Sequence, residues 1–213
     1  MPEWTARGRR SAEDLKAAAL RVIARQGYPA TKITDITAEA GKSAGVFYRY
    51  FTDKDDLMRS VAEDFAGALH DRVSGGLGEQ HTMRDEHDVA EHVRAYWDIY
   101  RTFQGQMTGI YEASLMSVEF SSYWTRLHER HVATWAAHLA EAWSLEASDQ
   151  ECVLAARALV CMLEHYCRTT VPSLPNDADD EVHVRTLTRL AAHGILHGRA
   201  QTSESNRSDQ HLP

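Results

Sequence analysis

The sequence predicts an all-α fold of about nine helices, and three observations support this prediction. Apolar residues recur every three to four positions in successive segments, which is the period of an amphipathic helix. No run of alternating apolar and polar residues is bounded by turn dipeptides, so the sequence does not indicate strands. With 43% hydrophobic and 25% charged residues, the composition is that of a globular protein.

The first helix is expected over residues 12–26. Ser11 followed by Asp14 resembles a capping box, and the apolar period then continues until Gly27. Residues 1–10 contain three arginines but no apolar period. We therefore expect them to form a flexible basic arm.

Two short helices are expected next. Thr34 can cap the first of them, which ends at Gly41, where a left-handed backbone conformation costs least. Ser43 can cap the second, over residues 44–50.

Longer helices follow. Asp53 can cap the first of them, Gly105 is expected to separate two others, and Ser148 with Glu151 resembles a second capping box. These helices are expected over residues 54–74, 86–103, 106–117, 121–144, 149–170 and 178–197. The polar tail, residues 199–213, is expected to be disordered.

The charge of the chain is unevenly distributed. Residues 1–51 hold nine lysines and arginines against five aspartates and glutamates, a net charge of +4. The whole chain has a net charge of −8, so the remaining residues carry −12. A basic N-terminal quarter on an acidic body suggests that one end of the protein binds a polyanion.

The two short helices and the turn between them match a helix-turn-helix that is braced by the first helix. In such a unit the second short helix needs large apolar residues inward and small or polar residues outward, so that it can enter the major groove. Phe47 and Phe51, one turn apart, provide the apolar anchors, while residues 43–45 are small. The segment is therefore a candidate DNA reader.

Many residues of this region form a signature at fixed spacing: Gly27-Tyr28, Ala30-Thr31, Asp35-Ile36, Ala40-Gly41, Ser43, Gly45, Phe47-Tyr48-Arg49-Tyr50-Phe51, Asp53-Lys54 and Leu57. With this signature, residues 11–69 resemble the DNA-binding domain of the TetR/AcrR family of one-component bacterial transcriptional regulators. The rest of the chain agrees with the family in length and helical character.

The resemblance implies a function. It implies a sequence-specific DNA-binding regulator, a homodimer on a palindromic operator and not an enzyme. Such a protein is most often a repressor that a small effector releases from DNA. An activator or an effector-independent regulator of the same family is the alternative.

The resemblance also assigns roles to residues of the DNA reader. Thr34 and Lys54 match phosphate-anchoring positions, and Arg49 carries the donor fork that can read a guanine. Tyr48 and Tyr50 match positions that contact a phosphate or a thymine methyl group, although either could instead pack against the first helix. The residues expected to contact DNA are Thr34, Lys42, Ser43, Ala44, Gly45, Val46, Tyr48, Arg49, Tyr50 and Lys54.

Two residues depart from the family pattern. Lys42 stands where the family usually has valine, and Thr37 where it usually has alanine. Lys42 could add a phosphate contact or could be a solvated residue of the turn, and the sequence leaves both possibilities open.

We expect a DNA-binding domain over residues 11–53, a connecting helix over 54–74 and a ligand-binding and dimerisation domain over 75–198. One helix-turn-helix recognises only a few base pairs, so a dimer must supply the second half-site. The helix 149–170 is apolar nearly all round and must be covered on every side. Together with the helix 178–197, it is expected to form the homodimer interface.

The acidic body is rich in aromatic and methionine residues, which suit an adaptable apolar pocket. Core packing would account for any one of them. As a group they suggest a site for a largely apolar effector with one polar or acidic end, such as a fatty acyl, steroid-like or aromatic compound. The residues expected to line this pocket are Trp97, Tyr100, Met107, Tyr111, Trp124, His128, Trp135, Met162, His165 and Tyr166.

Other classes of protein are not indicated. No apolar stretch approaches the roughly 18 residues of a transmembrane helix, and no signal-peptide core precedes the first helix. We therefore expect a cytoplasmic protein that does not bind membranes. No hydrolase or nucleotide-binding motif occurs, so an all-helical enzyme or lipid-binding module is the remaining rival class.

Metal and cofactor sites are not expected either. The three cysteines form no CxxC pair. His128 and His131 have the spacing of two ligands on one helical face, but no third ligand lies near them in the sequence.

Overall fold

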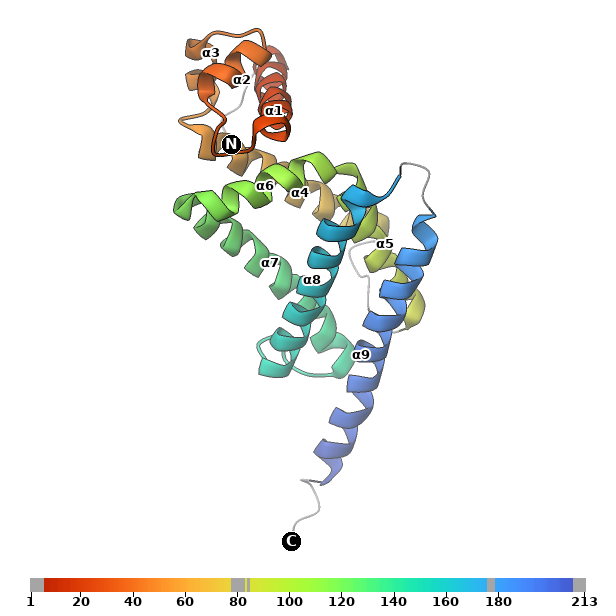
Figure 1. Cartoon of the computed structure of the whole chain (residues 1–213). Coiled ribbons are helices and arrows are strands. Elements are labelled where there is room, and N and C mark those ends of the chain that lie inside the picture. The colour runs from red at the N-terminus through yellow and green to blue at the C-terminus, as the bar shows by residue number, and fades with distance from the viewer. Residues whose placement is uncertain (1–5, 78–82, 84, 176–178, 209–213) are drawn as a thin grey trace. The chain divides into compact units, whose positions relative to one another are not determined.

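The computed structural model describes residues 6–77, 83, 85–175 and 179–208 (Figure 1). Within these residues all regular elements are helical, which confirms the predicted all-α class with nine α-helices. The elements are α1 (Ala6–Gln26), α2 (Ile33–Glu39), α3 (Ala44–Tyr50), α4 (Lys54–Leu77), α5 (Glu86–Thr102), α6 (Gln104–Met116), α7 (Val118–Trp143), α8 (Gln150–Thr170), the 3-10 helix η1 (Val171–Ser173) and α9 (Asp180–Ser208).

The chain divides into two compact units. The first comprises Met1–Gly67 and Phe103–Leu127, and the second comprises Ala68–Thr102 and His128–Pro213. The division therefore falls inside α4, between α5 and α6, and inside α7, whereas the sequence suggests boundaries after residues 53 and 74. Helix α6 belongs to the unit that contains the helix-turn-helix and not to the other one.

Close packing of α6 explains its place in the first unit. Gly109 of α6 is buried, and a Cβ at this position would lie only 3.3 Å from Met58 of α4 and 3.4 Å from Leu20 of α1. The missing side chain therefore allows the backbone of α6 to approach both helices closely. Apolar residues occur on several faces of α6, so its sequence does not reveal these neighbours.

The first helix begins at Ala6 and not at residue 12. Arg7, Arg9 and Arg10 are consequently helical, and the predicted flexible arm is wrong for these positions. Alanine and arginine are good helix formers, and extending an existing helix by one turn costs little. Residues 1–5 lie outside the described residues.

Buried side chains from four helices hold the helix-turn-helix together. Leu15 of α1, Ile36 of α2, Phe47 of α3 and Leu57 of α4 are fully buried. Phe51 is also buried, with its ring centroid 5.7 Å from that of Phe47. The two inward anchors predicted from the sequence are thus confirmed. Burying each such side chain contributes about 1.5–3 kcal/mol.

Several helix ends follow the predicted signals. The Ser43 hydroxyl accepts a hydrogen bond from the N–H of Val46 at 3.4 Å, which caps α3. The Asp53 carboxylate accepts from the N–H of Asp56 at 2.7 Å at the start of α4. Gly41 has a φ of 62°, the left-handed conformation that favours glycine after α2.

The predicted cap of α2 is wrong. This helix begins at Ile33, so Thr34 is its second residue and is exposed. The N–H of Lys32, just before the helix, donates to the carboxylate of Asp35 at 3.0 Å. Because Asp35 lies on the first turn, its negative charge also interacts favourably with the helix dipole.

Two later boundaries also differ from the prediction. Gly105 lies inside α6, since the break between α5 and α6 falls at Phe103. Asp149, and not Ser148, caps α8 by accepting from the N–H of Glu151 at 2.8 Å. A carboxylate one residue downstream thus replaces the predicted hydroxyl cap.

The last helix is longer than predicted. Helix α9 continues to Ser208, past Gly198 and through most of the tail that was expected to be disordered. A glycine inside a helix costs only about 1 kcal/mol, and each further residue adds a hydrogen bond. Residues 209–213 lie outside the described residues.

In the second unit, α5 packs against both α8 and α9. Arg101 of α5 pairs with Asp180 of α9 at 3.1 Å. The indole N–H of Trp143, at the end of α7, donates to the carbonyl of Ile195 in α9 at 2.6 Å. No helix in the described part of the chain combines the length and hydropathy of a bilayer-spanning segment.

Candidate nucleic-acid interface

The inner face of α3 determines which side chains its outer face presents. Phe47 is fully buried, and its ring lies 5.5 Å from that of Tyr48 in an edge-on arrangement. With Phe51 also in the core, α3 cannot rotate about its axis without exposing an aromatic ring. Tyr48 is 60% exposed and Arg49 is exposed as well. Both are therefore accessible to a ligand, and their contact with DNA stays a prediction.

The N-terminal turn of α3 carries small, accessible residues. Ser43, Ala44 and Gly45 are exposed, and Val46 is half-buried. A Cβ at Gly45 would have the Oγ of Ser43 as its near neighbour, at 3.8 Å. Small residues at this end allow the backbone of a recognition helix to come close to base edges in the major groove.

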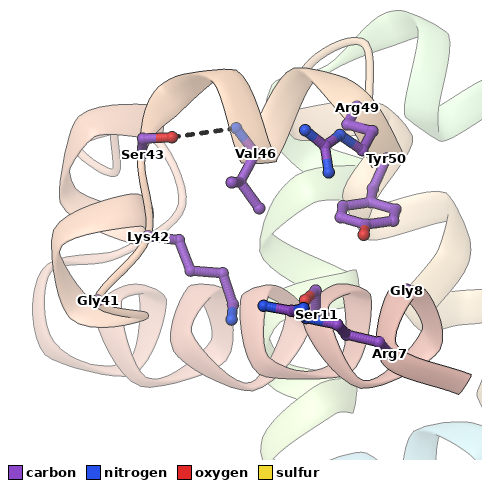
Figure 2. A pocket seen from close by; sticks show the side chains of 9 residues that line it. All are labelled: Arg7, Gly8, Ser11, Gly41, Lys42, Ser43, Val46, Arg49 and Tyr50. Carbon is purple, nitrogen blue, oxygen red and sulfur yellow. Dashed lines mark hydrogen bonds between the residues drawn. The ribbon is translucent and has the colours of Figure 1, made fainter.

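A hollow of about 560 Å³ lies between the N-terminal part of α1 and the helix-turn-helix (Figure 2). Of the nine described residues that line it, three are cationic and none carries a carboxylate. The lining residues are Arg7, Gly8 and Ser11 of α1, Gly41, Lys42 and Ser43 of the turn, and Val46, Arg49 and Tyr50 of α3. The sequence did not single out Arg7 or Ser11 as members of the DNA reader.

Lys42 reaches from the turn toward α1 (Figure 2), where its ammonium pairs with the carboxylate of Asp14 at 3.0 Å. The side chain of Lys42 is only 19% exposed, whereas that of Asp14 is 47% exposed. Lys42 is therefore not a solvated residue of the turn, which was one of the two possibilities left open by the sequence.

Lys54, which the family resemblance assigns to a phosphate contact, has backbone partners in this structure. Its Nζ donates to the carbonyl oxygens of Tyr28 at 2.6 Å and Thr31 at 2.8 Å, and lies 4.0 Å from the centroid of the Tyr28 ring. Burial lowers the pKa of the Lys54 ammonium below its ordinary value. An ammonium has three N–H donors, and two are used here. Lys54 therefore braces the loop between α1 and α2.

Thr34 and Tyr50 have different surroundings. Thr34 is exposed on the first turn of α2. Tyr50 is half-buried and lines the hollow, with its ring directed into it (Figure 2). Thr34 thus stays a candidate for a phosphate contact, and Tyr50 would meet a ligand inside the hollow.

A hydrogen-bond group that was not predicted from the sequence ties α6 to the loop before α2 and to the start of α4. The hydroxyls of Tyr28 and Ser117 both donate to the carboxylate of Asp55. Glu112 of α6 accepts from the backbone N–H of Tyr28 at 2.7 Å. Burial, with the hydrogen bond to Asp55, raises the pKa of the Tyr28 phenol. No local signal could reveal this group, because one of its hydrogen bonds joins residues 84 positions apart.

Three of the residues expected to line an effector pocket belong to the first unit. Met107 is buried, and Trp124 is half-buried with its ring 6.5 Å from that of Phe65. Tyr111 is 38% exposed, because it follows the buried Ile110 and so lies about 100° away around the helix.

The other seven belong to the second unit. Trp97 is buried there and stacks on His183 at a centroid distance of 5.1 Å, while His165 is exposed and shares a hydrogen bond of 2.9 Å with Arg168. The remaining five are the buried Tyr100 and Trp135 and the half-buried His128, Met162 and Tyr166. The pocket as a whole stays a prediction.

Two histidines on α7 have opposite environments. The Nδ1 of His128 lies 3.0 Å from the carboxylate of Glu164, and this hydrogen bond raises the pKa of His128. Burial lowers the pKa of His131 to about 4, and its ring stacks on Tyr96 at a centroid distance of 5.7 Å. Within the described residues, no three His, Cys, Asp or Glu side chains are grouped so that they could hold a metal ion.

Known proteins match the N-terminal region. Residues 15–61 match the family model described as bacterial regulatory proteins, tetR family. Over 65 residues the chain is 35% identical to the uncharacterized HTH-type transcriptional regulator YvdT of Bacillus subtilis, covering 30% of this chain and 34% of that protein. Over 69 residues it is 30% identical to the fatty acid metabolism regulator protein of the same organism, covering 32% and 36%. The match thus spans about a third of the length of these relatives.

Solved structures share the fold over most of the chain. The fatty acid degradation regulator FadR from Bacillus halodurans has a TM-score of 0.72 at 19% identity, covering 87% of this chain and 96% of that one. FadR from Bacillus subtilis in complex with stearoyl-CoA has a TM-score of 0.66 at 18% identity, covering 86% and 98%. These relatives and solved structures are all described as regulators. The helix-turn-helix region thus matches the tetR family of bacterial regulatory proteins in sequence, and the chain shares its overall fold with solved bacterial regulators.

Proposed function

We propose that this protein is a sequence-specific DNA-binding transcriptional regulator of the cytoplasm, acting as a dimeric repressor that a small, largely apolar effector releases from its operator. The observation that carries the proposal is the setting of α3. Its aromatic inner face is locked in the core, while Tyr48 and Arg49 are exposed and its first turn is small. This is the arrangement that a recognition helix needs in order to read base edges.

A dimer supplies the second half-site of a palindromic operator, because one reading head covers too few base pairs. Exposed apolar residues on α8 and α9 support an interface there: Leu154 is 56% exposed and Leu190 is 59% exposed. The two helices are linked by a 2.8 Å hydrogen bond between Tyr166 and His183, so they can act as one surface. We therefore assign the homodimer contact to α8 and α9.

The effector is proposed to bind the aromatic and methionine residues of the body, with Trp97, Tyr100 and Trp135 as the buried members in the second unit. A fatty acyl thioester is the first compound to test, because a protein of similar fold was solved with stearoyl-CoA and a relative is described as a regulator of fatty acid metabolism. Steroid-like and aromatic compounds are the next candidates.

The proposed coupling is reciprocal. Effector binding is proposed to favour a conformation in which the two helix-turn-helix units of the dimer no longer match successive major grooves. Effector and DNA then lower each other's binding affinity by the same factor. An activator would instead keep or gain DNA affinity when the effector binds. An effector-independent regulator would show no change, and an all-helical enzyme or lipid-binding module would show no specific DNA binding.

The DNA-binding proposal is tested with the duplex upstream of the protein's own gene. Specific, salt-sensitive retardation of this duplex in a gel, relative to an unrelated duplex of equal length, is the expected result. Arg49→Ala should reduce the preference for the upstream duplex. If the protein does not distinguish them at any salt concentration, the proposal is wrong.

The effector and the dimer are tested separately. Fluorescence anisotropy of the labelled duplex, titrated with stearoyl-CoA, should report release of DNA, with free coenzyme A as the control. Light scattering after size exclusion should report a dimer that Leu190→Glu converts into a monomer. Val118→Glu, a charge at another exposed apolar position (85%), should leave the dimer intact. A monomeric wild-type chain would contradict the assigned interface.

A further inference from the structure

The hollow between α1 and the helix-turn-helix is surrounded by cations. Figure 2 shows Arg7, Lys42 and Arg49 around the same open space. Among the described residues, Lys42 has a carboxylate, that of Asp14, within ion-pair distance. The volume of about 560 Å³ exceeds that of a single phosphate group, so the hollow can admit a phosphodiester with part of its sugars. Its charge and size therefore suit a nucleic-acid backbone.

Lys42 is the unusual member of this group, because the family resemblance leads us to expect valine at its position. Its side chain is mostly covered and its ammonium is held 3.0 Å from Asp14 of α1. Asp14 is itself half-exposed, and an ion pair in such a place adds little stability because water screens it. The pair therefore holds the ammonium at the hollow without binding it strongly.

We propose that the hollow is a binding site for a phosphate of the DNA backbone, at which Lys42 exchanges its partner Asp14 for that phosphate. This rests on the proposed function, because the phosphate belongs to the duplex whose bases α3 reads. Ser43, Val46 and Arg49 of the α3 region line the same hollow, so the site adjoins the recognition helix. A helix seated in the major groove has backbone phosphates beside it, and contacts to them position the protein.

In this arrangement Asp14 competes with DNA for Lys42. It keeps the ammonium in place while DNA is absent, and it must be displaced when DNA binds. Removing the negative charge of Asp14 should therefore tighten DNA binding, and removing the positive charge of Lys42 should weaken it. Because a phosphate carries no sequence information, both changes should be equal for specific and unrelated DNA.

The test measures DNA affinity of the full-length chain by fluorescence anisotropy over a range of salt concentrations. Two duplexes are used: the region upstream of the gene and an unrelated sequence of equal length. The variants are Lys42→Val, Lys42→Arg and Asp14→Asn. Glu13→Gln is the matched control for Asp14→Asn, because Glu13 is the neighbouring acid of α1, is 64% exposed and pairs with Lys16 and not with Lys42.

Lys42→Val is expected to reduce the slope of log affinity against log salt by about 0.9 per half-site, which corresponds to about eightfold weaker binding at 0.1 M salt. The loss should be the same for both duplexes, and Lys42→Arg should restore the slope. Asp14→Asn should tighten binding to both duplexes, whereas Glu13→Gln should have a smaller effect. Circular dichroism and thermal unfolding check that each variant folds, and Lys42→Gln replaces Lys42→Val if the latter does not.

The two proposals fail in different ways. Wild-type protein that binds both duplexes equally overturns sequence-specific regulation, while the unrelated duplex still tests the phosphate site. Wild-type protein that prefers its own duplex, with affinity and slope unchanged in Lys42→Val, overturns the phosphate site alone. Equal tightening by Asp14→Asn and Glu13→Gln overturns the competition by Asp14. Absence of binding to either duplex at low salt overturns both proposals.

Discussion

Glu112 of α6 accepts a hydrogen bond from the backbone N–H of Tyr28 at 2.7 Å, although 84 residues separate the two. The phenol of the same tyrosine donates to Asp55, which also accepts from Ser117. The loop after α1, the start of α4 and the C-terminal end of α6 are therefore joined through Tyr28 and Asp55.

Replacing Glu112 tests the strength of this link. Glu112→Ala removes a charged acceptor from a half-buried N–H and should lower the free energy of unfolding by about 1.5–3 kcal/mol, measured in urea. Glu119→Ala is the control, because Glu119 is 79% exposed and its nearest cation, Arg59, is 3.7 Å away. The control should change stability by less than about 0.5 kcal/mol. Equal effects of the two substitutions would show that the hydrogen bond to Tyr28 contributes nothing.

Lys54 should matter for stability more than for DNA affinity. Lys54→Met keeps most of the stem but removes the hydrogen bonds to the carbonyls of Tyr28 and Thr31. We expect a loss of about 1–3 kcal/mol in the free energy of unfolding, with the salt dependence of DNA binding unchanged below the melting temperature. If the variant has normal stability and the slope of log affinity against log salt falls by about one, Lys54 contacts a DNA phosphate.

Arg49 should carry base discrimination. Arg49→Ala removes the exposed donor fork of α3 and should cost about 1–3 kcal/mol for the upstream duplex, with a much smaller loss for an unrelated one. Competition anisotropy with both duplexes measures the ratio. Arg25→Ala, which removes a 56% exposed arginine paired with Glu39, is the control and should preserve the ratio. A uniform loss from Arg49→Ala would mean that this side chain contacts only the backbone.

The stability of the second unit should respond to pH through His131. Burial lowers its folded-state pKa to about 4, so the unfolded chain binds more protons between pH 6.5 and 4. Stability should consequently fall as the pH decreases through this range. His131→Phe keeps a ring against Tyr96 and should remove a loss on the order of 2 kcal/mol at pH 4, measured by thermal unfolding. Identical pH profiles of variant and wild type would contradict this.

His128 should make the stability of the second unit depend on pH in the opposite direction. Its hydrogen bond to Glu164 raises the folded-state pKa, so the folded chain binds more protons than the unfolded one. The stabilisation is fully present below the unfolded pKa near 6.5 and is lost as the pH rises through the folded value. His128→Gln should therefore lower the melting temperature at pH 6 more than at pH 9. A difference that is constant with pH would assign the effect to packing.

Local sequence signals were sufficient to predict much of the helix-turn-helix. The Ser43 and Asp53 caps and the anchors Phe47 and Phe51 were predicted correctly. Each of these features depends on residues within about one helical turn, and the sequence records such spacing directly. The same reasoning failed where two neighbouring residues could serve equally well, as at Ser148 and Asp149, or where polar residues extend a helix already formed, as in α1 and α9.

The sequence by itself determined the all-helical class, the helix-turn-helix and the charge asymmetry between the N-terminal quarter and the body. Only the tertiary structure decided that α6 packs against α1 and α4, that the Lys54 ammonium binds backbone carbonyls and that Lys42 faces a hollow beside Asp14. The physical reason is distance along the chain. Periodicity shows that a helix has a face to bury, but the partner of that face depends on shape and charge presented by residues tens of positions away, as with Glu112 and Tyr28.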